Sequence, residues 1–190
     1  LCSHVRICAQ DLKLIEISGL LISISDFHFG NMPRMKSLVL NSITDTRELN
    51  LNTFCPNVES IYIGSFADLE HLEVEHCSRL RNIQIYSNPK LTSMEFGNHP
   101  EVEELYCSYN GFSSFSLKGL PKLRSVDLGY NSALASLELD ENNGINALLI
   151  SGCAFQSVDD VLECCPSLNE LSCSGNRLTE LDLTKHLSIR

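Results

Sequence analysis

The stretch VEELYCSYNGFSSFSLKGLPKL, residues 102–123, decides the fold because it contains the same apolar spacing twice. Val102, Leu105 and Cys107 follow the spacing L-x-x-L-x-L, and Asn110 stands three residues beyond them. The segment FSSFSL, residues 112–117, repeats this spacing about eleven residues later. A spacing that occurs twice within 22 residues indicates a repeat protein.

The first spacing recurs along nearly the whole chain with a period of about 22 residues. Its eight copies are Leu12/Ile15/Ile17, Met35/Leu38/Leu40, Val58/Ile61/Ile63, Leu80/Ile83/Ile85, Val102/Leu105/Cys107, Leu123/Val126/Leu128, Ile145/Leu148/Ile150 and Leu168/Leu171/Cys173. A weaker second copy follows most of them: Ile24/Phe27/Phe29, Leu69/Leu72/Val74, Leu91/Met94/Phe96, Phe112/Phe115/Leu117, Leu134/Leu137/Leu139 and Leu178/Leu181/Leu183. Each repeat therefore has two apolar edges, one for each half turn of a coil.

A ninth position completes the pattern L-x-x-L-x-L-x-x-(N/C). It is occupied by Leu20, Ile43, Phe66, Asn88, Asn110, Asn131, Cys153 and Asn176. Buried amides at such a position satisfy the backbone groups of a turn. We therefore predict that Asn88, Asn110, Asn131, Cys153 and Asn176 form a structural ladder and take no part in catalysis.

This pattern resembles the leucine-rich repeat family. VEELYCSYNGFSSFSLKGLPKL and LNELSCSGNRLTELDLTKH look like the nested, cysteine-containing repeats of microbial, internalin-like proteins, whereas CPNVESI and CPSLNEL resemble the repeats of F-box-type adaptors. The resemblance implies an α/β fold class: a right-handed leucine-rich-repeat solenoid, or horseshoe, with a parallel β-sheet on its concave face and few helices. We expect one domain over residues 1–190, with about eight repeats and with residues 1–11 as an N-terminal flank.

The prolines exclude the rival interpretation of an eleven-residue apolar period, a right-handed helical coiled coil. All six lie two residues before an apolar triplet, where they would break a continuous helix; they are Pro33, Pro56, Pro89, Pro100, Pro121 and Pro166. They are expected at the corners of a coil. One short helix is predicted in the seventh repeat, where Phe155, Val158, Val161, Leu162 and Cys165 have helical spacing, Ser157 can cap and Asp160 lies in the first turn.

A single coil buries too little apolar surface to offset the entropy of ordering its 22 or so residues, so neighbouring coils must stack. The central apolar residues of successive triplets, such as Ile61, Ile83, Leu105 and Val126, should then lie side by side on adjacent parallel strands.

Composition limits the classes of partner. The chain has 190 residues, 43% of them hydrophobic, and a formal charge of −10. This charge opposes binding to nucleic acid or anionic lipid. The longest apolar stretch, residues 12–29, is interrupted by Lys13, Glu16 and Asp26, so membrane insertion is not expected. No intact signal peptide is recognised, and the chain looks processed or cut from a longer one.

Nine cysteines could indicate a disulfide framework, but their number is odd and their positions follow the repeat. We interpret them as buried thiols, which slightly favours a cytoplasmic protein, with a cell-surface or secreted one as the alternative. The vicinal pair Cys164 and Cys165 could instead be redox-active, and Cys2 and Cys8 could pair.

No catalytic or metal-binding motif was found, and no cofactor is predicted. His71 and His76 are five residues apart and would face opposite sides of a strand. Glu73, Glu95, Glu138 and Asp182 share one repeat position and are expected to form a solvated edge, with a site for calcium or a basic partner as the alternative.

The side chains between the apolar positions must point outward from the sheet. All five tyrosines fall in or just after these strands in repeats three to six, and tyrosine is enriched in binding surfaces. Gln84, Glu104 and Asp127 add polar and acidic groups among them. We predict a partner-binding surface formed by Tyr62, Gln84, Tyr86, Glu104, Tyr106, Tyr109, Asp127 and Tyr130.

The sequence thus favours a non-enzymatic module that binds a protein on the exposed face of its sheet. The alternative is a substrate-recognition segment of a larger intracellular assembly, such as a ubiquitin-ligase adaptor or a bacterial effector. The oligomeric state cannot be predicted.

Overall fold

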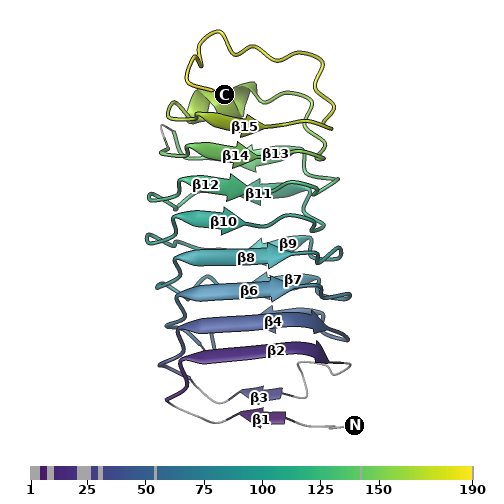
Figure 1. Ribbon diagram of the computed structural model, residues 1–190, viewed down its shortest axis with the longest axis vertical. Coiled ribbons are helices and arrows are strands. Elements are labelled where there is room, and N and C mark those ends of the chain that lie inside the picture. Colours follow the sequence, from purple (N-terminus) through teal and green to yellow (C-terminus); the bar gives the residue numbers. More distant parts are fainter. Residues whose placement is uncertain are drawn as a thin grey trace.

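The structure is a computed structural model that describes residues 5–7, 11–20, 27–29, 32–53, 55–141 and 143–189. Its main feature is one parallel sheet of eight strands stacked in chain order (Figure 1). The strands are β2 (Leu14–Leu20), β4 (Ser37–Ile43), β6 (Ser60–Gly64), β8 (Asn82–Tyr86), β10 (Glu104–Tyr106), β12 (Ser125–Asp127), β14 (Ala147–Leu149) and β15 (Glu170–Ser172).

The register of this sheet follows the repeat. Ile61 pairs with Ile83, Ile83 with Leu105, and Leu105 with Val126 across β6, β8, β10 and β12. All four side chains are fully buried. The prediction that the central apolar residues occupy adjacent parallel strands is confirmed.

Shorter parallel strands form the opposite wall of the coil, where the second apolar triplets lie. They form three separate sheets: β1 (Val5–Ile7) with β3 (Phe27–Phe29), then β5 (Glu48–Asn50) with β7 (His71–Glu73) and β9 (Ser93–Glu95), then β11 (Ser114–Ser116) with β13 (Ser136–Glu138). We call these three the back sheets. Strand β1, which lies within residues 1–11, pairs in parallel with β3 of the first repeat.

The core lies between the two walls. Most Leu, Ile and Val side chains of the triplets between Met35 and Leu168 are buried, whereas several in the first and last repeats are only partly buried. The largest buried side chains are Phe66, Phe112 and Phe155. In β4, β6 and β8 buried positions alternate with half-buried ones, as expected for strands that have one face on the core.

The prolines do mark the corners. Six turns are each closed by a backbone hydrogen bond from the first apolar residue of a triplet to a carbonyl three residues earlier. Each turn has proline as its second residue, where the fixed φ of proline suits the turn. The turns span Met32–Met35, Cys55–Val58, Asn88–Leu91, His99–Val102, Leu120–Leu123 and Cys165–Leu168.

The predicted helix is present as α1 (Asp159–Cys164), with Asp160 in its first turn. The predicted cap is wrong by one residue. Val158 holds the N-cap position, and the Ser157 hydroxyl accepts a hydrogen bond from the backbone N–H of Asp159 at 3.0 Å. Within the described part of the chain no helix is long and apolar enough to cross a membrane.

Candidate functional site

Four of the predicted binding residues are neighbours on the exposed face of the eight-stranded sheet. The register places Tyr62 of β6 beside Gln84 of β8, Gln84 beside Tyr106 of β10, and Tyr106 beside Asp127 of β12. All four side chains are half-buried. Glu104 lies in the neighbouring outward row, between Asn82 and Ser125, and is exposed.

Tyr86 lies at the end of β8 and packs edge-on against Tyr62. Their ring centroids are 4.9 Å apart and their planes make an angle of 81°. A Cβ on Gly64 would come within 2.9 Å of the Tyr86 ring, so glycine is what allows this ring to lie over β6.

Tyr109 and Tyr130 lie beyond the strands, in the turns that follow β10 and β12. Their rings are stacked, with centroids 4.4 Å apart and planes 10° from parallel. The two side chains are 52% and 54% exposed. Gly129 connects Tyr109 to Asp127, because its carbonyl accepts the Tyr109 N–H at 2.9 Å and its N–H donates to the Asp127 carboxylate at 2.9 Å. Partial burial, the Tyr130 hydroxyl and the Asp127 carboxylate raise the pKa of Tyr109.

Both tyrosines occupy a left-handed backbone position that occurs in every coil of the main sheet. The residues with positive φ at this position are Gly19, Ser42, Ser65, Ser87, Tyr109, Tyr130, Gly152 and Gly175, with φ between 55° and 69°. The sequence analysis missed this row, although the glycine or serine directly before the ninth position in six repeats was its signal. A bulky residue rarely adopts positive φ, and such residues cluster at functional sites.

Several charged side chains beside the main sheet are paired at the side where the strands begin. Lys36 bonds Glu59, and Glu101 pairs with Lys122 at 2.8 Å and with Arg81 at 3.8 Å. Hydrogen bonds from Lys36 and Lys122 lower the pKa values of Glu59 and Glu101. Glu104 and Asp127, in contrast, form no ion pair with any described residue, so the tyrosine-bearing area carries unpaired negative charge.

The ninth-position residues form a chain of hydrogen bonds along the stack. The Asn110 amide donates to the carbonyls of Ile85 in the preceding coil at 2.8 Å and of Cys107 at 2.9 Å, and its oxygen accepts the backbone N–H of Asn88 at 3.1 Å. Asn88, Asn131 and Asn176 donate to the preceding coil in the same way. The Cys153 thiol does so too, toward the Leu128 carbonyl at 3.4 Å. These contacts connect the turns of successive coils.

Seven cysteines in the described residues are free thiols. Burial raises the pKa values of Cys55 and Cys107 and brings that of Cys77 to about 11, so these thiols remain protonated and unreactive at neutral pH. Cys164 is half-buried and Cys165 is buried. The proposed pairing of Cys2 with Cys8 lies outside the described residues.

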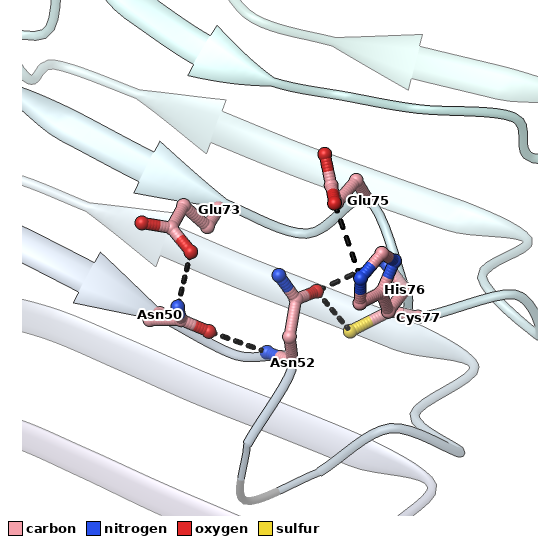
Figure 2. Close-up of polar contacts among 6 residues, drawn as sticks. All are labelled: Asn50, Asn52, Glu73, Glu75, His76 and Cys77. Carbon is pink, nitrogen blue, oxygen red and sulfur yellow. Dashed lines mark hydrogen bonds and ion pairs between the residues drawn. The ribbon is translucent and has the colours of Figure 1, made fainter.

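The histidine and acidic cluster of the third repeat consists of local contacts (Figure 2). The Asn52 side-chain oxygen accepts the backbone N–H of His76 at 2.9 Å, His76 pairs with Glu75 at 3.1 Å, and Asn50 donates to Glu73. His71 instead contacts Ser93 at 2.8 Å, so the two imidazoles have separate partners.

Other members of the predicted acidic row also have local partners. Glu138 pairs with Lys118 at 3.4 Å, and Asp182 accepts the backbone N–H of Thr184 at 2.8 Å. Across the described residues, no group of three or more His, Cys, Asp or Glu side chains is placed to hold a metal ion.

Comparison with known proteins supports the fold. No family model matches the chain, and no curated protein matches its sequence. Among solved structures, the chain is similar to the functional domain of InlJ from Listeria monocytogenes, which is described as including a cysteine ladder. The match has a TM-score of 0.69 and 22% identity, and it covers 83% of this chain and 34% of the InlJ chain.

The fold is thus an internalin-like leucine-rich-repeat solenoid, as the resemblance implied. The chain spans about a third of the length of the InlJ chain that it matches.

Proposed function

We propose that this chain is a non-enzymatic protein-binding module that recognises its partner on the exposed face of the eight-stranded sheet. The contact surface is the tyrosine-bearing area over β6 to β12 and the turns that follow β10 and β12. It comprises Tyr62, Gln84, Tyr86, Glu104, Tyr106, Tyr109, Asp127 and Tyr130.

The observation that carries this proposal is the residue type at the left-handed position. Six coils have glycine or serine there, whereas Tyr109 and Tyr130 place half-exposed aromatic rings in the same strained conformation. A left-handed conformation costs a residue with a Cβ atom about 1–2 kcal/mol. The stacked ring contact, worth about 0.5–1.5 kcal/mol, does no more than offset this cost. The two rings therefore add little net stability to the fold, and we attribute them to binding.

The size of the surface is also suited to a protein partner. Eight strands at a spacing of about 4.8 Å form a sheet roughly 34 Å long. Tyrosine offers a rigid apolar ring and one hydroxyl at a small cost in side-chain entropy, which favours its use in interfaces.

The test is a double substitution, Tyr106→Ser with Tyr130→Ser, made in the whole chain. A partner is first isolated with the unchanged chain, and its affinity for each variant is then measured by calorimetry. We expect the double variant to lose at least about tenfold in affinity, because exposed aromatic anchors carry much of the energy of an interface. The melting temperature should stay within a few degrees of the original.

A matched control removes two charges from the back of the coil. Lys118 and Glu138 pair with each other there, so Lys118→Ser with Glu138→Ser leaves neither charge without its partner. This control should retain its affinity. Equal affinity of all three chains would show that the partner binds elsewhere, and a large loss of stability in the tyrosine variant would show that these rings pack the fold.

A further inference from the structure

Tyr109, Tyr130 and Asp127 together form a feature that we call the tyrosine step. It lies beyond the strands of the fifth and sixth repeats, where the two stacked rings are half-exposed. The Asp127 carboxylate lies next to it, because it accepts the N–H of Gly129, and the carbonyl of Gly129 accepts the N–H of Tyr109. Tyr130 also lies over Gly152 of the next coil, because a Cβ on Gly152 would come within 2.8 Å of its ring.

The Asp127 carboxylate is held in place and is only partly used. One of its oxygens accepts the backbone N–H of Gly129 at 2.9 Å, which fixes the side chain toward the turn that carries Tyr130. The other oxygen has no hydrogen-bond partner among the described residues, and no described cation pairs with the group. The step therefore offers fixed acceptor capacity next to two aromatic surfaces.

The negative charge around the tyrosine step favours a cationic ligand. The whole chain carries a formal charge of −10, and Glu104, which also lacks an ion pair with any described residue, stands on the strand adjacent to that of Asp127. A second anion would be repelled, and an apolar group would take water from the carboxylate without replacing its hydrogen bonds. A cation gains from both the carboxylate and the electron-rich rings.

We propose that the tyrosine step binds an arginine side chain of the partner protein, an inference that rests on the proposed function. The planar guanidinium stacks on an exposed part of the tyrosine pair while its N–H groups donate to Asp127. Arginine fits better than lysine because its rigid fork can stack and donate at the same time, whereas a compact ammonium is more strongly hydrated.

The test uses short capped peptides, so that it does not depend on the unidentified partner. Three peptides, Ac-Gly-X-Gly-NH₂ with X as arginine, lysine or citrulline, are titrated into the whole chain while the tyrosine ring signals are followed by NMR. A contact of this size corresponds to a dissociation constant of about 1–10 mM. The arginine peptide should shift the signals of Tyr109 and Tyr130 saturably, with at least threefold tighter binding than the lysine peptide. Citrulline, which has the same shape without the charge, should produce no saturable shift.

Two variants assign the effect to the step. Asp127→Asn retains an oxygen for the Gly129 N–H and should weaken arginine binding at least tenfold. Tyr109→Ser with Tyr130→Ser should abolish it while the circular dichroism spectrum is kept, because serine holds the same backbone position at Ser42, Ser65 and Ser87. The control Glu138→Gln removes one charge from the back sheets and should leave binding unchanged.

Three results would overturn the proposal: equal shifts with citrulline, lysine binding at least as tight as arginine, or arginine binding unaffected by Asp127→Asn. These outcomes are separable from failure of the proposed function. A partner that loses affinity with Tyr106→Ser but not with Asp127→Asn supports the binding face and excludes the arginine contact. If the arginine peptide binds the step but the partner does not contact this face, the step binds arginine and the proposed function is wrong.

Discussion

The first two coils and the last four close the same turn in different ways. In the first two, the strands β2 and β4 are seven residues long and reach the ninth position, where Leu20 pairs with Ile43. In the last four, the nominal strands are three residues long, and the ninth position holds Asn110, Asn131, Cys153 and Asn176. The third and fourth coils, with five-residue strands, are intermediate.

The difference shows that every turn needs hydrogen-bond partners for its backbone groups, and that the residue at the ninth position determines which groups provide them. The backbone N–H and C=O groups of the buried turn that follows each strand need hydrogen-bond partners. Longer strands provide them through the sheet ladder, while shorter strands provide them through buried amides and one thiol. Both solutions keep the left-handed residue in place, from Gly19 to Gly175.

The largest expected effect comes from removing one amide. Asn110→Leu would leave the carbonyl of Ile85 and the N–H of Asn88 without the Asn110 amide, while the carbonyl of Cys107 would keep its second partner, Asn131. At about 1–3 kcal/mol for each of these two unsatisfied buried groups, the free energy of unfolding should fall by roughly 2–6 kcal/mol, measured by urea denaturation. The matched change in the other region, Ile43→Val, only trims a buried side chain and should cost about 1 kcal/mol. Equal costs would mean that the amides add nothing specific to the turn.

The next effect concerns the boundary between the regions, where the back sheets break between β9 and β11. His99 lies there, fully buried, against the ring of Phe96 at 5.0 Å, and neither of its ring nitrogens makes a hydrogen bond of good geometry with the described residues. Burial lowers its pKa below the usual value of about 6.5, although nearby carbonyls of Phe96 and Cys77 oppose the shift. The folded protein therefore holds His99 neutral.

This arrangement predicts a pH dependence with a definite sign. Below pH 6.5 the unfolded chain binds a proton that folded His99 does not, so the stability is complete above that pH and falls as the pH drops toward the folded pKa. Because one proton is involved, the loss should not exceed about 1.4 kcal/mol for each pH unit below 6.5, measured by urea denaturation. His99→Leu should remove this loss, while His76→Gln, at an exposed histidine, should retain it. A His99→Leu protein with the original pH profile would show that His99 does not titrate in this range.

The smallest effect tests the strain at the left-handed position. Ser87→Gly should stabilise the fold by about 1 kcal/mol, because glycine adopts positive φ without cost. Tyr109→Gly relieves the same strain but loses a stacked ring contact of about 0.5–1.5 kcal/mol, so its net effect should be close to zero. Thermal unfolding of the two variants compares them directly. A strongly destabilised Tyr109→Gly protein would assign the ring to the fold instead of to a binding surface.

Much of the fold could be predicted because it follows from local spacing. The triplets fix which side chains are buried, a buried face fixes the register of Ile61, Ile83, Leu105 and Val126, and proline at the second residue of a turn fixes the corners. The break in the back sheets and the assignment of Val5–Ile7 to strand β1 could not be predicted. Both depend on pairing with a neighbouring coil, which spacing within one repeat does not report.

The candidate site divides in the same way. The sequence placed the tyrosines in or just after the strands and marked Tyr62, Gln84, Tyr106 and Asp127 as one outward row, since side chains alternate along a strand. It did not reveal that Tyr109 and Tyr130 stack, or that both have left-handed backbone conformations. Those features arise where two turns from adjacent coils come together.

The amino-acid sequence by itself determined the period, the buried positions and the outward row, because burial of apolar side chains repeats with the coil. Only the tertiary structure decided which turn residues meet between coils and which carboxylates find a cation. Asp127 remains unpaired among the described residues while Glu101 pairs with Lys122, because ion pairing depends on the side chains that the neighbouring coil brings within reach.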